Sequence, residues 1–278
     1  MPQPKRENSM GKIQRQLRGS QQKAIAKIFE GLTYRHSRWT VWSDFVLMAA
    51  CTLSMLDVEH REERVQMYNN AAKKYNAAEL EKLRDIFEAV IQAIEENPDQ
   101  DFLGELFMAL ELSNEARGQF FTPYSVCAMM AKMQCGDIAE KVEAKGYLSV
   151  NDPAVGAGAL LIAFANECRA QGVNYQEHIL FVGQDIDYVA AMMCYIQISL
   201  LGCAGYVIVG DTLTTPPTEP LSNQNVWYTP MLYRDIWQWR LFIKALARCN
   251  TPRATQTETT RADIAPNPEA EVGQLTLF

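Results

Sequence analysis

Apolar residues spaced three and four positions apart predict helices through most of residues 20–112. The turn-forming sequence Asn97-Pro98-Asp99 interrupts this pattern, and a short helix is expected after it, at residues 101–112. The strict alternation typical of strands is missing from this part of the sequence, and so is any internal repeat. We therefore expect a helical N-terminal region over residues 20–116. Its clearest helix is expected at residues 78–95, with apolar positions at Leu80, Leu83, Phe87, Val90, Ile91 and Ile94.

The hydrophobic pattern changes in the second half of the chain, where short β-prone runs alternate with helical stretches. Strand and helix in alternation, joined by short connections, indicate right-handed crossovers and a parallel sheet. The expected fold is therefore α/β, with a shortened Rossmann-like sheet in a domain of residues 117–249. In chain order the expected elements are a strand at 147–151, a helix at 159–170, a strand at 178–183, a helix at 189–201 and a strand at 206–209.

The two ends of the sequence differ from its middle. Residues 1–19 are rich in lysine and arginine, and we expect a basic flexible arm there, solvated rather than bound to phosphates. Residues 250–273 consist largely of Thr, Ala, Pro, Glu and Arg, with almost no large apolar residue. This composition predicts a disordered tail over residues 250–278.

Composition narrows the classes of protein that fit. The 278-residue chain has a formal net charge of −7, which argues against a free-standing nucleic-acid binder. Its seven cysteines form no Cys-x-x-Cys pair and its three histidines are scattered, so neither a disulfide framework nor a metal site is expected. No secretory signal or membrane-spanning run is recognisable, and this predicts a cytoplasmic protein without membrane contact.

One glycine-rich loop carries most of the chemical information. Asp152-Pro153-Ala154-Val155-Gly156-Ala157-Gly158 follows the first expected strand and precedes a helix. Glycines let the backbone approach a ligand closely, and the following helix presents free N–H groups. The loop lies at the carboxyl end of a strand, where open α/β sheets bind ligands. It is neither the dinucleotide fingerprint, which has a third glycine, nor a P-loop, which continues with Gly-Lys-Ser/Thr.

Two aspartates follow the next two expected strands. Asp185 stands just past the second, where an acid can accept hydrogen bonds from both hydroxyls of a ribose. Asp211 stands just past the third, where an acid can accept one from an adenine amino group. The alternative is that these residues, like Asp187, are helix caps or turn residues. We favour the cap for Asp187 and nucleotide binding for Asp185 and Asp211.

A segment before the glycine-rich loop, together with the loop and the two aspartates, resembles the motif order of a known family. Gly118-Gln119-Phe120-Phe121-Thr122-Pro123, followed by a helix, closely resembles the first motif of adenine-N6 DNA methylases of the type I restriction-modification kind. In that family the motif also precedes an Asp-Pro-Ala-x-Gly-x-Gly loop and two acids, and the resemblance covers residues 20–213. It implies a class I methyltransferase sheet, S-adenosylmethionine as cofactor, and a bacterial, phage or mobile-element source. Carried over position by position, it implies cofactor contacts at Phe121, Thr122, Pro123, Asp152, Pro153, Ala154, Gly156, Gly158, Asp185 and Asp211.

The motif that holds the methylated base in this family is not recognisable in the sequence, so catalytic residues are not identified. The family carries Asn/Asp-Pro-Pro-Tyr/Phe after a fourth strand, which holds the target amino group and stacks on a flipped base. The nearest strings here, Thr215-Pro216-Pro217-Thr218 and Asn225-Val226-Trp227-Tyr228, are interpreted as loop and core packing. Two hypotheses stay open. The chain is a DNA adenine methylase with a divergent or partner-supplied base site, or it is a degenerate methylase that serves as a cofactor-binding adaptor or regulator.

The last five residues form a separate motif. Gln274-Leu275-Thr276-Leu277-Phe278 closely resembles the peptide by which bacterial proteins dock on the DNA polymerase sliding clamp. The resemblance implies clamp contacts at Gln274, Leu275, Leu277 and Phe278, presented by a disordered tether. The alternative is a C-terminal strand that folds back on the protein's own core. We favour docking, because the motif is terminal and follows the expected disordered tail. Tethering to a ring on DNA would also bring an acidic protein to its substrate.

Overall fold

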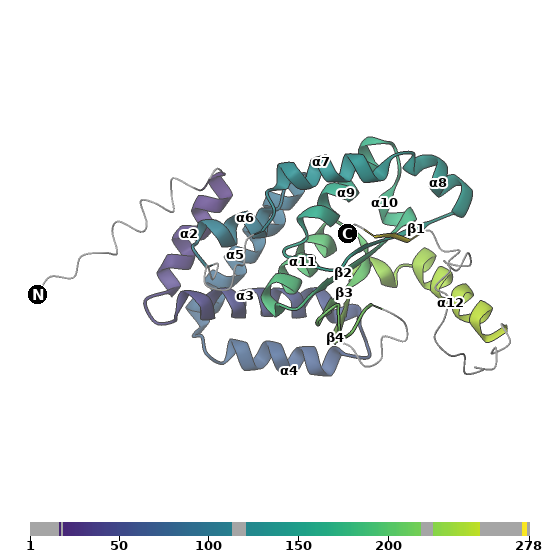
Figure 1. Ribbon diagram of the computed structural model, residues 1–278. Helices are drawn as coiled ribbons and strands as arrows, with labels where there is room; N and C mark the ends of the chain where they lie inside the picture. The colour runs from purple at the N-terminus through teal and green to yellow at the C-terminus, as the bar shows by residue number, and fades with distance from the viewer. Residues whose placement is uncertain (1–16, 18, 113–120, 218–224, 251–273, 277–278) are drawn as a thin grey trace, which may run out of the picture.

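The computed structural model describes residues 17, 19–112, 121–217, 225–250 and 274–276 (Figure 1). The expected basic arm of residues 1–19 therefore lies almost entirely outside the described residues. The N-terminal region is helical, as predicted. Its elements are α2 (Ser20–Leu32), α3 (Arg38–Leu53), η1 (Ser54–Leu56), α4 (Arg61–Ala72), α5 (Ala77–Glu96) and α6 (Phe102–Ala109).

Local sequence signals set the ends of these helices. Asn76 caps α5: its side chain accepts a hydrogen bond from Glu79 N, and the Glu79 side chain accepts one from Asn76 N. Asp101 caps α6 by accepting a hydrogen bond from Gly104 N at 3.0 Å. The expected turn Asn97-Pro98-Asp99 separates the two helices. Side-chain caps thus satisfy backbone N–H groups at the start of both helices.

Helix α3 is apolar along most of its length. Continued by η1, it forms a segment, Arg38–Leu56, that is long and apolar enough to cross a membrane by these two criteria alone. Of its most apolar stretch, however, 56% is buried inside the protein. It packs against α4 and against a helix of the sheet domain, α11 (Tyr188–Leu200). Such burial is typical of a helix in the core of a domain.

The second half of the chain builds a sheet from β1 (Leu148–Asp152), β2 (Ile179–Asp185), β3 (Ala204–Val209), β4 (Asn225–Tyr228) and β5 (Gln274–Thr276). The strands lie in the order β4-β3-β2-β1-β5. The strands β1, β2 and β3 are parallel neighbours, with Asp152 opposite Gly183 and Asp185 opposite Val209. This confirms the predicted α/β fold with a helical N-terminal region. The sheet is parallel from β5 to β3, as expected, whereas the edge strand β4 is antiparallel to β3. The helices of this half, besides α11, are α7 (Tyr124–Cys135), α8 (Ile138–Lys145), α9 (Ala159–Ala170), α10 (Tyr175–His178), η3 (Pro230–Tyr233) and α12 (Asp235–Asn250).

The strand β5 is a difference from the disordered tail expected over residues 250–278. It pairs in parallel with β1, with Ser149 opposite Gln274 and Asn151 opposite Thr276. Without it, the edge of β1 would present a row of unpaired backbone groups, which is a strong template for any extended segment. These three residues thus form a strand that folds back on the protein's own core, which is the alternative to docking described above. Residues 251–273 and 277–278 lie outside the described part of the chain.

One hydrophobic core joins the helical region to the sheet. It runs from the buried faces of α2, α3, α5 and α6, through α11, to the inner side chains of the strands. A buried arginine, Arg64 of α4, strengthens this junction. Its guanidinium lies 3.5 Å from the centre of the Trp227 ring, and its Nη2 donates to the Val226 carbonyl at 3.2 Å. The helical region and the sheet are therefore held in one fixed arrangement.

Candidate functional site

The loop after β1 turns sharply at two glycines. Gly156 has φ +54° and Gly158 has φ +97°, a region that residues with a side chain rarely adopt. A Cβ on Gly156 would lie 3.1 Å from the Phe121 ring, so the absence of a side chain lets that ring cover the loop. Val155 N donates to the Gln184 carbonyl at 2.9 Å, which ties the loop to β2. The conformation is therefore fixed from both sides before any ligand binds.

Gly158 allows two helices to pack closely. A Cβ at this position would lie 2.9 Å from the Cys194 sulfur atom of α11, closer than such atoms approach one another in proteins. The glycine thus allows the N-terminus of α9 to lie directly against α11. The first turn of α9, with its free N–H groups, follows the loop directly in the chain.

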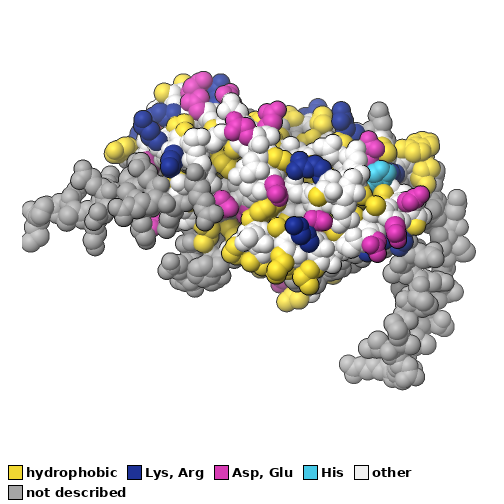
Figure 2. All heavy atoms as spheres, turned by 90° about the horizontal axis from the view of Figure 1, so that it is seen from above, with side chains coloured by type: hydrophobic (Ala, Val, Ile, Leu, Met, Phe, Trp, Pro, Cys, Tyr) yellow, Lys and Arg dark blue, Asp and Glu magenta, His cyan; other side chains and the backbone are white. Residues whose placement is uncertain are grey.

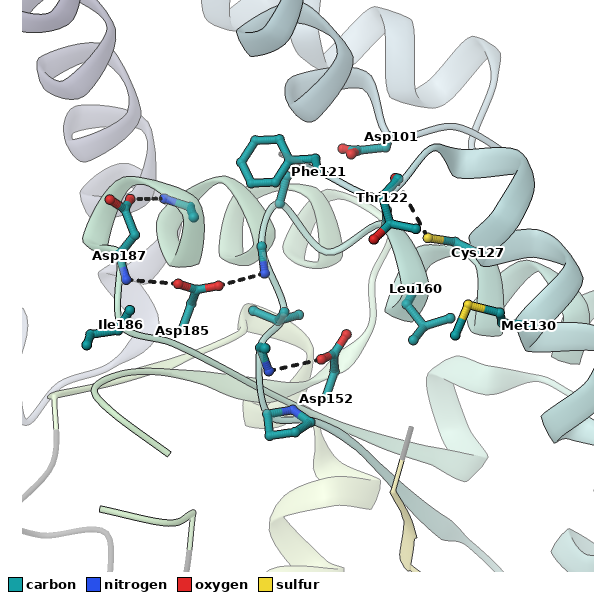
Figure 3. A pocket seen from close by; sticks show the side chains of 17 residues that line it. Asp101, Phe121, Thr122, Cys127, Met130, Asp152, Leu160, Asp185, Ile186 and Asp187 are labelled. Atoms are coloured by element: carbon teal, nitrogen blue, oxygen red, sulfur yellow. Dashed lines mark hydrogen bonds between the residues drawn. The ribbon is translucent and has the colours of Figure 1, made fainter. Parts of the chain in front are cut away.

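Asp185 joins the loop after β1 to the loop after β2 (Figure 3). Its Oδ2 accepts a hydrogen bond from Gly156 N at 2.8 Å, and its Oδ1 accepts one from Asp187 N at 2.8 Å. A carboxylate oxygen has two acceptor positions, so each oxygen can still accept another hydrogen bond. Asp187 itself caps α11 by accepting from Ala190 N at 2.9 Å, which confirms the cap predicted for it.

Two other carboxyl groups near this loop are buried. Asp152, at the end of β1, is 4% exposed and accepts a hydrogen bond from Ala154 N. Asp101, the cap of α6, is 2% exposed. Burial raises the pKa of each to about 6, and it also raises the pKa of Asp185. At pH 7.5 Asp101 and Asp152 are mainly ionised, although no cation from the described residues accompanies these carboxyl groups in the cavity that they line.

These groups line a cavity of about 670 Å³ at the carboxyl ends of β1 and β2, which we call the main cavity. Its volume is in the range of small-molecule sites. Among the described residues around it there are four aspartates and no lysine, arginine or histidine. The main cavity is lined by Asp101, Phe121, Thr122, Cys127, Met130, Asp152, Pro153, Ala154, Val155, Gly156, Ala157, Ala159, Leu160, Asp185, Ile186, Asp187 and Ala190.

A second cavity, of about 620 Å³, adjoins the first. The two share Asp101, Phe121 and Thr122, so these residues form the wall between them. Figure 3 shows the Asp101 carboxyl group near Phe121 and Thr122, away from Asp185 and Asp187. The second cavity is lined by Gln22, Asp101, Gly104, Glu105, Met108, Ala109, Phe121, Thr122, Pro123, Tyr124 and Ser125.

Most cofactor residues predicted from the sequence come together in the main cavity. Three of them do not line it. Pro123 lines the second cavity and precedes α7, and Gly158 packs against α11. Asp211 lies in the turn after β3, where its Oδ1 accepts from Leu213 N at 2.9 Å. The residues that line the cavity as expected are Phe121, Thr122, Asp152, Pro153, Ala154, Gly156 and Asp185.

The two strings nearest to an acceptor motif have structural roles. Trp227 is fully buried, and its Nε1 donates to Asn225 Oδ1 at 3.0 Å, so β4 is a packed edge strand. Thr215 Oγ1 donates to the Asp211 carbonyl, and the Thr215 carbonyl accepts from Gln184 Nε2. These contacts agree with the core and loop interpretations made from the sequence.

Several cavity residues were not predicted, and Asp101 is the most informative of them. Its one sequence signal is that of a cap, an aspartate directly before an apolar helix. Cys127 and Met130 also line the cavity, from successive turns of α7. Burial raises the pKa of Cys127 to about 11, so its thiol is protonated at neutral pH and is not an activated nucleophile. Within the described residues, no group of three side chains is placed to hold a metal ion.

Known proteins resemble this chain in two ways, through similar solved structures and through a family model. No curated protein matches this chain. Among solved structures, one described as a class I S-adenosylmethionine-dependent methyltransferase from Listeria monocytogenes is similar with a TM-score of 0.40 at 14% identity. The match covers 77% of this chain and 57% of that one. The type I restriction-modification methyltransferase subunit from Streptococcus thermophilus gives a TM-score of 0.33 at 15% identity, covering 77% and 59%.

This chain thus spans less than two thirds of the length of both solved structures. A family model identifies the family, which the two solved structures do not. The model described as N-6 DNA methylase matches residues 99–265, which include α6, the loop after β1, Asp185 and Asp211. The matched stretch is more than half of the chain, and the protein belongs to the N-6 DNA methylase family.

Proposed function

We propose that this protein binds S-adenosylmethionine in the main cavity. The observation that carries the proposal is the charge of the cavity lining, four aspartates without a described basic residue. Such a lining repels the phosphates of dinucleotides and nucleoside triphosphates, whereas it attracts a ligand with a sulfonium and an ammonium group. The cavity adjoins a glycine loop at the end of a strand, as nucleotide sites do in open α/β folds.

The residues present fit the parts of this cofactor. We assign the ribose hydroxyls to Asp185, because each of its oxygens accepts one of the described backbone hydrogen bonds and a carboxylate oxygen has two acceptor positions. Phe121 and Thr122 lie at the other end, where we place the methionine part, with Asp152 and the backbone of Gly156 between. Asp211 stays a predicted adenine contact. When bound, the cofactor supplies an electrophilic methyl group.

We further propose that the methyl acceptor is an adenine amino group in DNA, because the chain belongs to a family of DNA N6-adenine methylases. One face of the described part of the chain carries no extended basic surface for binding duplex DNA. On the face shown in Figure 2, Lys and Arg side chains lie among Asp and Glu side chains rather than in a basic stripe. A partner subunit or a tether would supply the missing contacts.

A specific observation favours a second function, that of a cofactor-binding adaptor without transferase activity. The described parts of both candidate acceptor strings are used for packing or for turn hydrogen bonds, and neither lines the main cavity. Methyl transfer needs an acceptor nitrogen held in line with the methyl group. An adaptor needs only the cofactor site.

Two measurements test these proposals. Calorimetry with S-adenosylmethionine tests binding, and absence of binding by the wild type would refute the cofactor proposal. Transfer of a labelled methyl group to mixed duplex and single-stranded DNA then separates the two functions. Transfer that Asp185→Ala abolishes supports the methylase, whereas tight binding without transfer to any DNA supports the adaptor.

We also propose that the last five residues dock on a bacterial sliding clamp, and that the protein is cytoplasmic. The clamp proposal is supported by the sequence Gln274-Leu275-Thr276-Leu277-Phe278 alone. Because Gln274, Leu275 and Thr276 pair with β1, docking requires β5 to leave the sheet. Clamp binding and strand pairing are then competing states of the same segment.

A further inference from the structure

Asp101 is a buried carboxylate whose two oxygens differ in their contacts with the described residues. Its Oδ1 accepts hydrogen bonds from Gly104 N at 3.0 Å and from Gln197 Nε2 at 2.8 Å. Its Oδ2 accepts none from the described residues, although the side chain is only 2% exposed and lines both cavities. Ionised carboxylates are rarely buried without a cation or a full set of donors.

Capping of α6 does not account for this arrangement. A cap needs a single accepting oxygen, and a serine or an asparagine would supply it without burying a charge. Here the carboxyl group is also oriented by Gln197, a residue of α11 that is 1% exposed. The Gln197 side chain also donates to the Ala157 carbonyl of the glycine loop at 2.8 Å and accepts from Leu103 N at 3.0 Å. Three segments of the chain therefore fix the position of Asp101.

The position of Asp101 relative to Asp185 indicates which part of a ligand it meets. Asp185 lies at the end of β2, where acids of nucleotide-binding folds contact the ribose. Asp101 lies beside Phe121 and Thr122, at the wall shared with the second cavity. A ligand with its ribose on Asp185 would therefore direct its other end toward Asp101. In S-adenosylmethionine that end carries an α-ammonium group, which has three N–H donors and a positive charge.

We propose that Oδ2 of Asp101 binds the α-ammonium group of the cofactor and that Gln197 positions it for this contact. Asp101 is then the residue that distinguishes ligands with an amino-acid end from adenosine derivatives without one. This inference rests on the proposed function, since it assigns one contact within the proposed cofactor site.

The test compares two ligands that differ in the amino-acid part. S-adenosylhomocysteine has the α-ammonium group, whereas 5′-methylthioadenosine has the same adenosine and thioether but no amino acid. The variant Asp101→Asn keeps the shape, the accepting Oδ1 and the ability to cap a helix, and removes the charge. We expect calorimetry to show that it binds S-adenosylhomocysteine about 10- to 100-fold more weakly, while its affinity for methylthioadenosine is unchanged.

Asp57→Asn is the matched control, because Asp57 is also a buried aspartate that accepts a backbone N–H, but it lines neither cavity. We expect this variant to lose less than threefold in affinity for either ligand, roughly the effect of a distant partly screened charge. Thermal unfolding of each variant shows that the fold is intact.

The possible results distinguish failure of the Asp101 assignment from failure of the cofactor-binding proposal. If Asp101→Asn binds S-adenosylhomocysteine as tightly as the wild type does, the assignment is wrong. Equal losses for the two ligands also overturn it, because Asp101 would then act on the cavity as a whole. If the wild type binds neither ligand, the proposed cofactor function fails, and the assignment fails with it.

Discussion

The backbone N–H of Gly156 donates to Oδ2 of Asp185 at 2.8 Å, across the carboxyl ends of β1 and β2. The same carboxyl group accepts from Asp187 N with its other oxygen. One side chain thus joins the glycine loop to the start of α11 and also faces the main cavity. Its contributions to loop geometry and to ligand binding are therefore coupled.

We predict that Asp185→Ala weakens binding of S-adenosylmethionine by at least tenfold. The variant loses the proposed ribose acceptor and also releases Gly156 and Asp187, and each hydrogen bond to a charged group contributes about 1.5–3 kcal/mol. Calorimetry measures the affinity. Asp211→Ala, measured in parallel, tests the predicted adenine contact, which the structure does not place at the cavity. An Asp185→Ala variant that binds as the wild type does would contradict the ribose assignment.

The sequence predicted this part of the site because its signals are local. The glycine loop is contiguous, and Asp185 directly follows an apolar strand, so the topology of a parallel sheet brings them together. Asp101 could not be predicted in the same way. Its place in the cavity depends on Gln197, which is 96 positions away in the sequence, and on packing of α6 against α11. The pairing of β5 with β1 likewise depends on an edge that no local pattern reveals.

Gly158→Ala is predicted to destabilise the protein by about 2–4 kcal/mol, as measured by urea unfolding. Part of the loss arises from the φ of +97°, and part from the contact with Cys194, whose sulfur would lie 2.9 Å from the new Cβ. Gly172→Ala is the control, because Gly172 has φ +79° but open space around its Cβ position. We expect it to cost only about 1 kcal/mol. Equal losses for the two variants would show that the contact with Cys194 contributes nothing.

The stability of the ligand-free protein is predicted to depend on the charge of Asp101. Burial raises the folded-state pKa of this carboxyl group to about 6, from an ordinary value of 3.8. The folded protein therefore keeps a proton that the unfolded chain releases, and this contribution to stability, complete below pH 3.8, is lost as the pH rises through 6.

Asp101→Asn stays neutral and avoids this loss. We expect the variant to be more stable than the wild type by about 2 kcal/mol at pH 7.5, with the difference vanishing near pH 4. Urea unfolding at pH 4, 5, 6 and 7.5 measures it. Higher stability combined with weaker binding of S-adenosylhomocysteine is the result that a ligand-binding carboxylate predicts. A variant less stable than the wild type at pH 7.5 would contradict the expected direction of the effect.

Arg64→Lys is predicted to destabilise the protein by about 2 kcal/mol, because an ammonium group cannot stack on Trp227 as a planar guanidinium does. The variant also loses the hydrogen bond to the Val226 carbonyl. Arg61→Lys, one turn earlier on the exposed side of α4, is expected to change stability by less than about 0.5 kcal/mol. A similar small effect of both changes would mean that the α4–β4 junction does not depend on Arg64.

The last five residues are predicted to bind a bacterial sliding clamp more weakly within the protein than as a free peptide. Pairing of Gln274, Leu275 and Thr276 with β1 reduces the fraction of molecules in which the segment is available, and the apparent affinity falls by the same fraction. We expect a difference of about three- to tenfold between the full chain and a peptide of residues 268–278, as measured by surface plasmon resonance.

Deletion of Leu277 and Phe278 is expected to abolish clamp binding while leaving the affinity for S-adenosylmethionine unchanged, which serves as the control for folding. Equal affinities of peptide and full chain would show that β5 does not compete with the clamp, and clamp binding that survives the deletion would refute docking through this peptide.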